Sequence, residues 1–154
     1  MKMSRKIIAV FLCIVMLFSF SACGENKNEE GSESTNASQS ESSLWNDAYY
    51  KEDAEIGEGK TTVYVKVEAQ NKSVTLTVHT DKTTLGEALF EYELIDGDEG
   101  EYGLYVKQVN GIKADYDTDK AYWAFFKDGE YMNSGVDQTE ISDTEHYELV
   151  YTKG

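Results

Sequence analysis

Apolar side chains occupy every second position of two neighbouring segments, 61–70 and 73–80. They are Val63, Val65, Val67, Val74, Leu76 and Val78. A period of two with β-branched residues is typical of a strand that is buried on one face. Because Asn71-Lys72 is a suitable turn between them, the pattern predicts an antiparallel hairpin.

The spacing of apolar residues changes after this hairpin. Leu85, Ala88, Leu89 and Tyr92 recur at i, i+3, i+4 and i+7, which places them on one face of a helix. Thr84-Leu85-Gly86-Glu87 fits a capping box, in which the threonine hydroxyl and the glutamate carboxylate each accept a backbone N–H of the other residue. The sequence therefore predicts one helix from Thr84 to about Tyr92.

Two further hairpins are expected beyond the helix. Asn110-Gly111 and Asp128-Gly129 are strong two-residue turn signals, because both central positions of a type I′ turn need a positive φ. The first would connect strand 104–109 to a return over 112–116, and the second would follow the aromatic strand 121–126. The stretch after the second turn predicts a short return and then a loop at Gly135, where glycine allows a change of direction.

A closing strand over 146–152 completes the predicted elements, since Tyr147, Leu149 and Tyr151 alternate there with polar or smaller residues. The acidic run 96–101 is interpreted as a solvated loop. Antiparallel strands with one segregated helix make an α+β domain. The order of elements predicts a small β-grasp-like domain, with an antiparallel or mixed sheet and one helix packed on one face.

The N-terminal end has a different pattern. Three basic residues precede an apolar run over 7–20 that is too short for a comfortable membrane span but suits a signal peptide. Ser21-Ala22-Cys23-Gly24 resembles a bacterial lipobox, in which cleavage leaves a cysteine whose thiol carries a lipid. Residues 1–22 are therefore predicted to be a lipoprotein signal peptide. Lipidation of Cys23 would anchor the protein on the extracellular face of the cell membrane.

Residues 23–60 are interpreted as the lipidated cysteine followed by a tether. Over 24–43 the chain has six Ser, five Glu and three Asn, so it cannot bury enough apolar surface to offset the entropy of ordering. Four apolar residues beyond it could pack on the domain, in a short helix: Leu44, Trp45, Tyr49 and Tyr50. The segment 52–60 is interpreted as solvated linker, which leaves 61–154 as the folded domain.

Charge and cysteine content exclude several classes of function. The chain of 154 residues has a net charge of −15. Removing the leader leaves 29 acidic side chains against 11 basic ones, the 14 of the whole chain less three in the leader, and so −18. So acidic a chain would repel phosphate backbones, and we expect no nucleic-acid partner. Both cysteines, Cys13 and Cys23, lie near the N-terminus, which excludes a disulfide scaffold and a cysteine metal site.

No catalytic or metal motif is apparent. Ser134, Asp143 and His146 can be combined into a triad on paper, but they lack the glycine pattern of a nucleophile elbow. Asp115, Asp117 and Asp119 match the first positions of a calcium loop. Later positions of that loop fail, since Lys120 replaces the glycine and Phe126 the final glutamate. We therefore expect neither an enzyme nor a metal site.

Several segments taken together resemble a known family. They are 84–89, 105–112, 121–129, 135–136 and 141–143. In this order they are similar to the transcobalamin-like C-terminal domain, which occurs in bacterial surface lipoproteins, over about residues 61–153. The resemblance implies a β-grasp-like fold. In the animal cobalamin carriers the corresponding domain closes over one face of the corrin, opposite a large helical domain that is absent from this chain.

The resemblance implies ligand-binding residues on the aromatic strand and in the loop after it. They are Trp123, Phe125, Tyr131, Asn133 and Ser134. The implied ligand is a cobalamin-like corrinoid, bound by a membrane-anchored extracellular lipoprotein, alone or with a second protein. Trp123 and Phe125 share one face of their strand, so they are either core residues or a platform for the ligand.

A second interpretation is a cell-surface module for interaction or adhesion, which contacts a protein or a polysaccharide and has no small-molecule ligand. A concave surface lined by aromatic residues favours the first interpretation. A flat edge strand or a flat apolar patch favours the second.

Overall fold

The computed structural model describes residues 44–101 and 103–154. The predicted signal peptide, the lipidation of Cys23 and the tether over 24–43 lie outside the described residues. Within the described part, none of the helices has the length and apolar character needed to cross a membrane.

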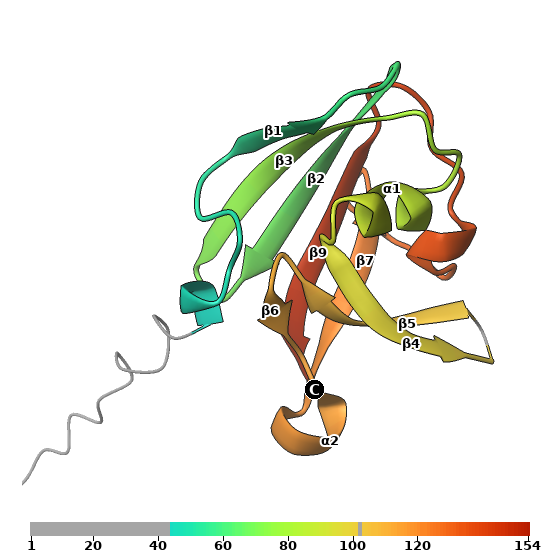
Figure 1. Ribbon diagram of the computed structural model, residues 1–154. Helices are drawn as coiled ribbons and strands as arrows, with labels where there is room; N and C mark the ends of the chain where they lie inside the picture. Colours follow the sequence, from blue (N-terminus) through green and yellow to red (C-terminus); the bar gives the residue numbers. More distant parts are fainter. Residues whose placement is uncertain (1–43, 102) are drawn as a thin grey trace, which may run out of the picture. The chain divides into compact units, whose positions relative to one another are not determined.

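The larger of two sheets has six strands in the order β1-β3-β2-β9-β7-β8 (Figure 1). They are β1 (Ala54–Gly57), β2 (Thr61–Ala69), β3 (Lys72–Thr80), β7 (Ala121–Lys127), β8 (Glu130–Tyr131) and β9 (His146–Lys153). Strand β2 pairs with β3 as the predicted antiparallel hairpin, but the turn is at Gln70-Asn71 and not at the predicted Asn71-Lys72, because Ala69 pairs with Lys72 and Gln70 has a φ of 57°. Strand β2 also pairs with β9 in parallel, and β9 pairs with β7 antiparallel. This mixed sheet with a helix on one face confirms the predicted α+β class.

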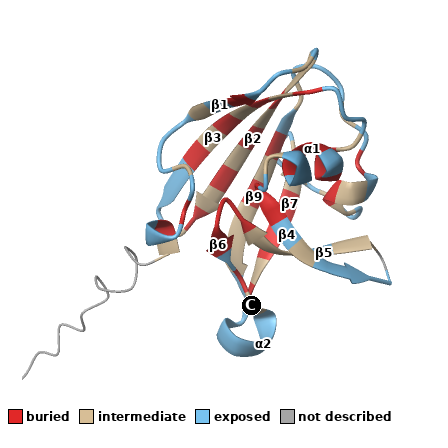
Figure 2. Cartoon of the chain, in the orientation of Figure 1, coloured by how far each residue is buried: buried red, intermediate tan, exposed pale blue. Residues whose placement is uncertain are grey.

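One face of this sheet forms the core, and the predicted alternation is seen there as buried stripes along β2 and β3 (Figure 2). The stripes consist of Val63, Val65, Val67, Val74, Leu76 and Val78. Strand β9 continues the same face, because Tyr147 is paired with Val65 and Leu149 with Val67. Each fully buried side chain of this size contributes about 1.5–3 kcal/mol to folding.

Helix α1 (Leu85–Glu91) packs on this face and begins with the predicted capping box. The Thr84 hydroxyl accepts from the Glu87 N–H at 3.3 Å, and the Glu87 carboxylate accepts from the Thr84 N–H at 3.4 Å. Hydrogen bonds from the hydroxyl and N–H of Thr83 and from the Thr84 N–H lower the pKa of Glu87. Gly86 is needed for close approach, because a Cβ there would lie 2.7 Å from the Cα of Asp137 in η2 (Val136–Gln138).

The smaller sheet consists of β4 (Ile95–Gly100), β5 (Gly103–Val109) and β6 (Ile112–Lys113). The Asn110-Gly111 turn is confirmed, with φ of 51° and 80°. The prediction of a solvated loop over 96–101 is wrong, because β4 pairs with β5 along its whole length. Backbone hydrogen bonds hold it in the sheet while most of its acidic side chains remain in solvent.

The predicted return over 112–116 is shorter than expected. Strand β6 ends at Lys113, and Asp115 then caps the single turn α2 (Tyr116–Asp119). The Asp115 carboxylate accepts from the N–H groups of Asp117 and Thr118 at 2.8 and 3.3 Å. A strong N-cap residue therefore ends the strand where the alternation alone would have continued it.

The interpretation of 52–60 as solvated linker is also wrong. Strand β1 pairs in parallel with β3 at the edge of the larger sheet, and its Ile56 is buried. Residues 44–60 are thus part of the folded unit. The pairing uses backbone groups in a strand of four residues, which is too short to show a period in the sequence.

The segment before β1 is held by one buried asparagine at the β5–β6 turn. The Tyr50 N–H donates to Asn110 Oδ1 at 2.9 Å, and Asn110 Nδ2 donates to the Tyr50 carbonyl at 2.8 Å. Upstream, η1 (Leu44–Asn46) buries the predicted Trp45, whose Nε1 donates to the Ala69 carbonyl at 3.0 Å. These contacts join the N-terminal part of the unit to both sheets.

Candidate functional site

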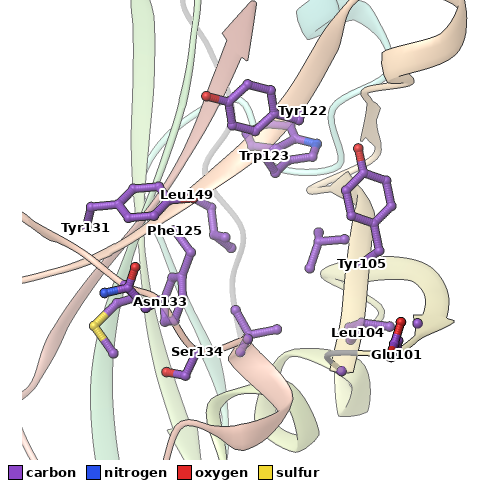
Figure 3. A pocket seen from close by; sticks show the side chains of 16 residues that line it. Glu101, Leu104, Tyr105, Tyr122, Trp123, Phe125, Tyr131, Asn133, Ser134 and Leu149 are labelled. Atoms are coloured by element: carbon purple, nitrogen blue, oxygen red, sulfur yellow. The ribbon is translucent and has the colours of Figure 1, made fainter. Parts of the chain in front are cut away.

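An open pocket of about 490 Å³ lies where the two sheets approach each other (Figure 3). One wall comes from β7, β8 and the loop that leads to η2, together with Leu149 of β9. The other wall comes from Gly100, Glu101 and residues 103–106 of the β4–β5 hairpin. This volume lies within the range of small-molecule sites, which is roughly 300–1,000 Å³.

All five residues that the sequence predicted for a ligand site line this pocket. Trp123 and Phe125 point into it from β7, whereas Tyr131, Asn133 and Ser134 follow the turn. The predicted turn at 128–129 brings the two groups together, with φ of 51° and 80°. A T-shaped contact between Phe126 and Tyr131, at 5.5 Å between ring centroids, fixes the returning strand.

Trp123 and Phe125 belong to the core and to the pocket at once. They are only 7% and 8% exposed. Trp123 makes a T-shaped contact with Tyr151 at 5.6 Å, and Phe125 stacks on Tyr147 at 6.0 Å. Both side chains therefore belong to the core, where they pack on β9, and both also border the pocket. Their role as a platform for a ligand stays a prediction.

The indole nitrogen of Trp123 is an unusual polar atom of this site. It is shielded from solvent and has no hydrogen-bond partner within the described chain. Figure 3 shows it pointing across the pocket toward the wall that carries Tyr105. An unmet buried donor costs about 1–3 kcal/mol, so native proteins rarely retain one without a reason.

The wall from β5 was missed by the sequence reasoning. Leu104 and Val106 line the pocket, and Tyr105 stands at its open side with 45% of its surface exposed. Gly97 lets β4 lie close to this wall, because a Cβ there would clash with the Tyr105 carbonyl. One sequence signal could have identified this wall. Tyr105 is an aromatic residue in the segment 105–112, which resembles the transcobalamin-like family.

The charge of the pocket is negative. Glu101 is the only charged residue among the described lining residues, which include no Lys, Arg or His. The carboxylate of Asp137 lies directly behind Gly103, where an added Cβ would be 2.8 Å from Oδ2. The pocket therefore suits an uncharged or cationic ligand better than an anion.

The polar rim is formed by the loop after β8. Ser134 Oγ lies 3.5 Å from the Thr139 hydroxyl, which itself donates to the Gly135 carbonyl at 2.9 Å. The Met132 N–H donates to the Phe125 carbonyl at 2.9 Å. These contacts tie the loop at both ends, so the polar groups of the rim are held next to the aromatic wall.

The structure separates the residues of the hypothetical catalytic triad, which are Ser134, Asp143 and His146. Ser134 contacts Thr139, the Asp143 carboxylate accepts from the Thr62 N–H at 2.8 Å, and His146 stacks on Tyr64 at 4.6 Å. Within the described part of the chain, no hydrogen bond joins any two of them. The expectation that the protein is not an enzyme stays a prediction.

The aspartates of the rejected calcium loop shape a turn. Asp119 accepts from the Tyr151 hydroxyl at 3.0 Å and from the N–H groups of Asp115 and Ala121 at 3.1 Å each. Burial alone would raise the pKa of Asp119, but these bonds hold it below its ordinary value. Burial and the bond to Asp119 raise the pKa of Tyr151 to about 12. The described residues contain no group of three His, Cys, Asp or Glu that could hold a metal ion.

Comparison with known proteins adds a family and a fold. Residues 82–153 match the model of a family described as a domain of unknown function, DUF4430. A candidate metal-binding protein from Ruminococcus gnavus ATCC 29149 is 34% identical, with a TM-score of 0.58 over 62% of this chain and 99% of that one. No curated protein matches the chain.

A second solved structure with a similar fold is haptocorrin in complex with Cbi. It is 18% identical, with a TM-score of 0.51 over 64% of this chain. The chain spans only 26% of the haptocorrin chain. At this identity the likeness shows the fold alone, which is the transcobalamin-like C-terminal fold that the sequence resembles.

Proposed function

This chain belongs to the DUF4430 family, and we propose that it is a membrane-anchored protein that binds a small molecule outside the cell in the pocket beside β7. A cobalamin-like corrinoid is the proposed ligand. The anchor would be the lipid on Cys23. The proposed protein has no catalytic activity of its own.

The observation that carries the proposal is the concave aromatic wall itself. Trp123, Phe125 and Tyr131 border one open pocket, with Tyr105 across from them. Aromatic side chains offer large, rigid apolar surfaces against which a conjugated macrocycle can pack. A corrinoid is such a ring system, and the fold shared with haptocorrin in complex with Cbi supports it as the candidate.

The openness of the pocket determines how much of the ligand this chain would cover. A corrinoid is larger than a pocket of about 490 Å³. The domain would therefore contact one face and one edge of the ring. The other face would be exposed to solvent or covered by a second protein.

The structure offers less support for the alternative function, a cell-surface module for interaction or adhesion. Strand β1 has four residues and β8 has two, so the edges of the larger sheet offer little backbone for a partner strand. The aromatic residues line a concave surface and not a flat patch. Metal binding is not part of the proposal, because the described residues hold no suitable cluster.

Calorimetric titration of the full chain in detergent, with cobalamin and with cobinamide, tests the proposal. We expect dissociation constants in the micromolar range or tighter. Trp123→Ala should abolish binding, and Tyr131→Ala should weaken it by about tenfold through the loss of one aromatic contact. Tyr64→Ala, on the opposite face of the sheet, is the control and should bind normally.

Tyr131 is 59% exposed, so its variant tests the pocket even if Trp123→Ala fails to fold. Absence of heat with both corrinoids, together with no rise in melting temperature, would exclude a corrinoid as the ligand of this chain alone. The interaction module, or a site completed by a second protein, would then be the better explanation.

A further inference from the structure

We infer that the pocket recognises an uncharged acceptor oxygen on its ligand, such as an amide carbonyl, and that the indole N–H of Trp123 donates to this oxygen. The inference rests on the proposed function of the pocket as a ligand site. It adds the chemical class of the group that is recognised and the atom that recognises it.

The first argument is the unmet donor. Trp123 is 93% buried, since 7% of its surface is exposed, and its Nε1 has no partner in the described residues. An indole nitrogen can only donate a hydrogen bond. A ligand that brings an acceptor removes the penalty of the unmet donor, whereas a purely apolar ligand leaves it in place.

The second argument is charge. The described lining residues contain no cationic side chain, and Glu101 lines the pocket with the Asp137 carboxylate behind Gly103. A bound carboxylate or phosphate would lie beside negative groups without a counter-charge, which makes its transfer from water unfavourable. A neutral carbonyl can accept from the indole without this penalty. The rim residues Asn133 and Ser134 can then serve the N–H side of an amide.

The third argument concerns access. The nitrogen is shielded from solvent, so an acceptor reaches it only when a wall side chain moves. The nitrogen points toward the wall that carries Tyr105, whose ring is 45% exposed (Figure 3). A ligand that displaces this ring would place its acceptor where bulk water does not compete. The hydrogen bond would then contribute more than one at an open surface.

Tryptophan indole N–H signals in nitrogen-15 NMR spectra of the full chain in detergent give a direct test. The sequence has two tryptophans, and Trp45 Nε1 already donates to the Ala69 carbonyl, so its signal is an internal control. The probes are cobinamide, which carries amides, and cobyrinic acid, which carries carboxylates in their place. Two small probes, 2-pyrrolidone and propionate, make the same comparison without a corrin ring.

The expected result is a downfield shift of the Trp123 signal with cobinamide and with 2-pyrrolidone, and none with the two acids. The Trp45 signal should not move. Trp123→Phe keeps an aromatic ring but has no donor, and it should weaken the binding of cobinamide by about tenfold. It should leave the weaker affinity for cobyrinic acid unchanged.

The outcomes separate this inference from the proposed function. If cobinamide binds but the Trp123 signal stays in place, or if the acids bind as well as the amides, the inference is overturned while a corrinoid site stands. If neither corrinoid binds and 2-pyrrolidone still shifts Trp123, the corrinoid proposal fails and the inference is supported. If no probe shifts Trp123, the inference is wrong.

Discussion

The two tryptophans of this chain are equally buried but differ in what their nitrogens meet. Each is 7% exposed. Trp45 donates to the Ala69 carbonyl at 3.0 Å, and Lys72 Nζ lies 4.8 Å from its ring centroid. Trp123 borders the pocket and its donor is unmet within the described residues. Burial alone therefore does not separate a structural residue from a proposed recognition residue, whereas the pairing of polar atoms distinguishes these two tryptophans.

The largest expected effect comes from removing each ring. Trp45→Ala should lower the free energy of unfolding by about 3–5 kcal/mol, because it leaves a cavity and an unpaired carbonyl. Trp123→Ala should cost at least about 1 kcal/mol less, since one side of its ring already borders the pocket and no acceptor is stranded. Urea unfolding followed by circular dichroism measures both. An equal or larger loss for Trp123→Ala would contradict the comparison.

Phenylalanine substitutions isolate the hydrogen bond from the packing. Trp45→Phe should cost about 1–3 kcal/mol more than Trp123→Phe, because only the first leaves a buried acceptor, the Ala69 carbonyl, without its donor. Both changes remove similar volume, so each is the control for the other. Equal costs in the same unfolding experiment would mean that Trp123 Nε1 is paired in solution.

Tyr147 is a third buried aromatic residue, and its hydroxyl donor, unlike Trp123 Nε1, has a hydrogen-bond partner among the described residues. The Tyr147 hydroxyl donates to the Glu145 carboxylate, which also contacts Lys127 Nζ at 2.6 Å and accepts from the Ser142 N–H at 2.9 Å. Tyr147→Phe should cost about 1 kcal/mol, the typical net value of one hydrogen bond. Its stacking on Phe125 is unchanged by this variant, so binding in the pocket should remain normal.

The same cluster predicts a pH dependence. Burial alone would raise the pKa of Glu145, but its bonds with Lys127, Tyr147 and Ser142 hold it below the ordinary value. The stabilisation is therefore present above the pKa of an unfolded glutamate, about 4.3, and is lost as the pH falls through the lower folded value. Burial and the Glu145 bond raise the pKa of Tyr147, so stability should also fall above pH about 10. In Tyr147→Phe, the free energy of unfolding should depend less on pH in both the acidic and the alkaline range than it does in the unmodified chain.

The smallest effect on the free energy of unfolding is expected for a substitution on the outer face of the larger sheet. Lys66 Nζ lies 2.7 Å from Glu68 and 3.4 Å from Glu148, with side-chain exposures of 38%, 37% and 29%. The hydrogen bond to Glu68 raises the pKa of Lys66, but solvent screens the pair. Lys66→Met should change stability by about 0.5 kcal/mol or less and leave the pocket unaffected. A larger loss would show that the outer face is more than a solvated surface.

Local patterns predicted most of the fold. The period of two located β2, β3 and β9, and the capping box located the start of α1. Both two-residue turns were correct, since their residues carry the positive φ that such turns need. Each of these signals depends on a few neighbouring residues, so the sequence contains all that is needed to recognise it.

The elements that the sequence did not reveal depend on distant partners. Strand β1 is held by its pairing with β3, and β4 by its pairing with β5, although neither segment has an apolar alternation. Every residue except proline has both a main-chain donor and a main-chain acceptor, so composition alone does not show where these hydrogen bonds will form. Acidic residues such as Asp98 and Glu99 are tolerated in β4 because their side chains remain in solvent.

For the site, the sequence by itself determined one wall. Trp123, Phe125, Tyr131, Asn133 and Ser134 lie within a single hairpin and its loop, and the family-like order of segments was sufficient to name them. Only the tertiary structure decided that β5 forms the opposite wall and that the described lining residues include no cation. It also decided that one of two equally buried indoles has no partner among the described residues, because a hydrogen bond depends on atoms brought together from distant parts of the chain.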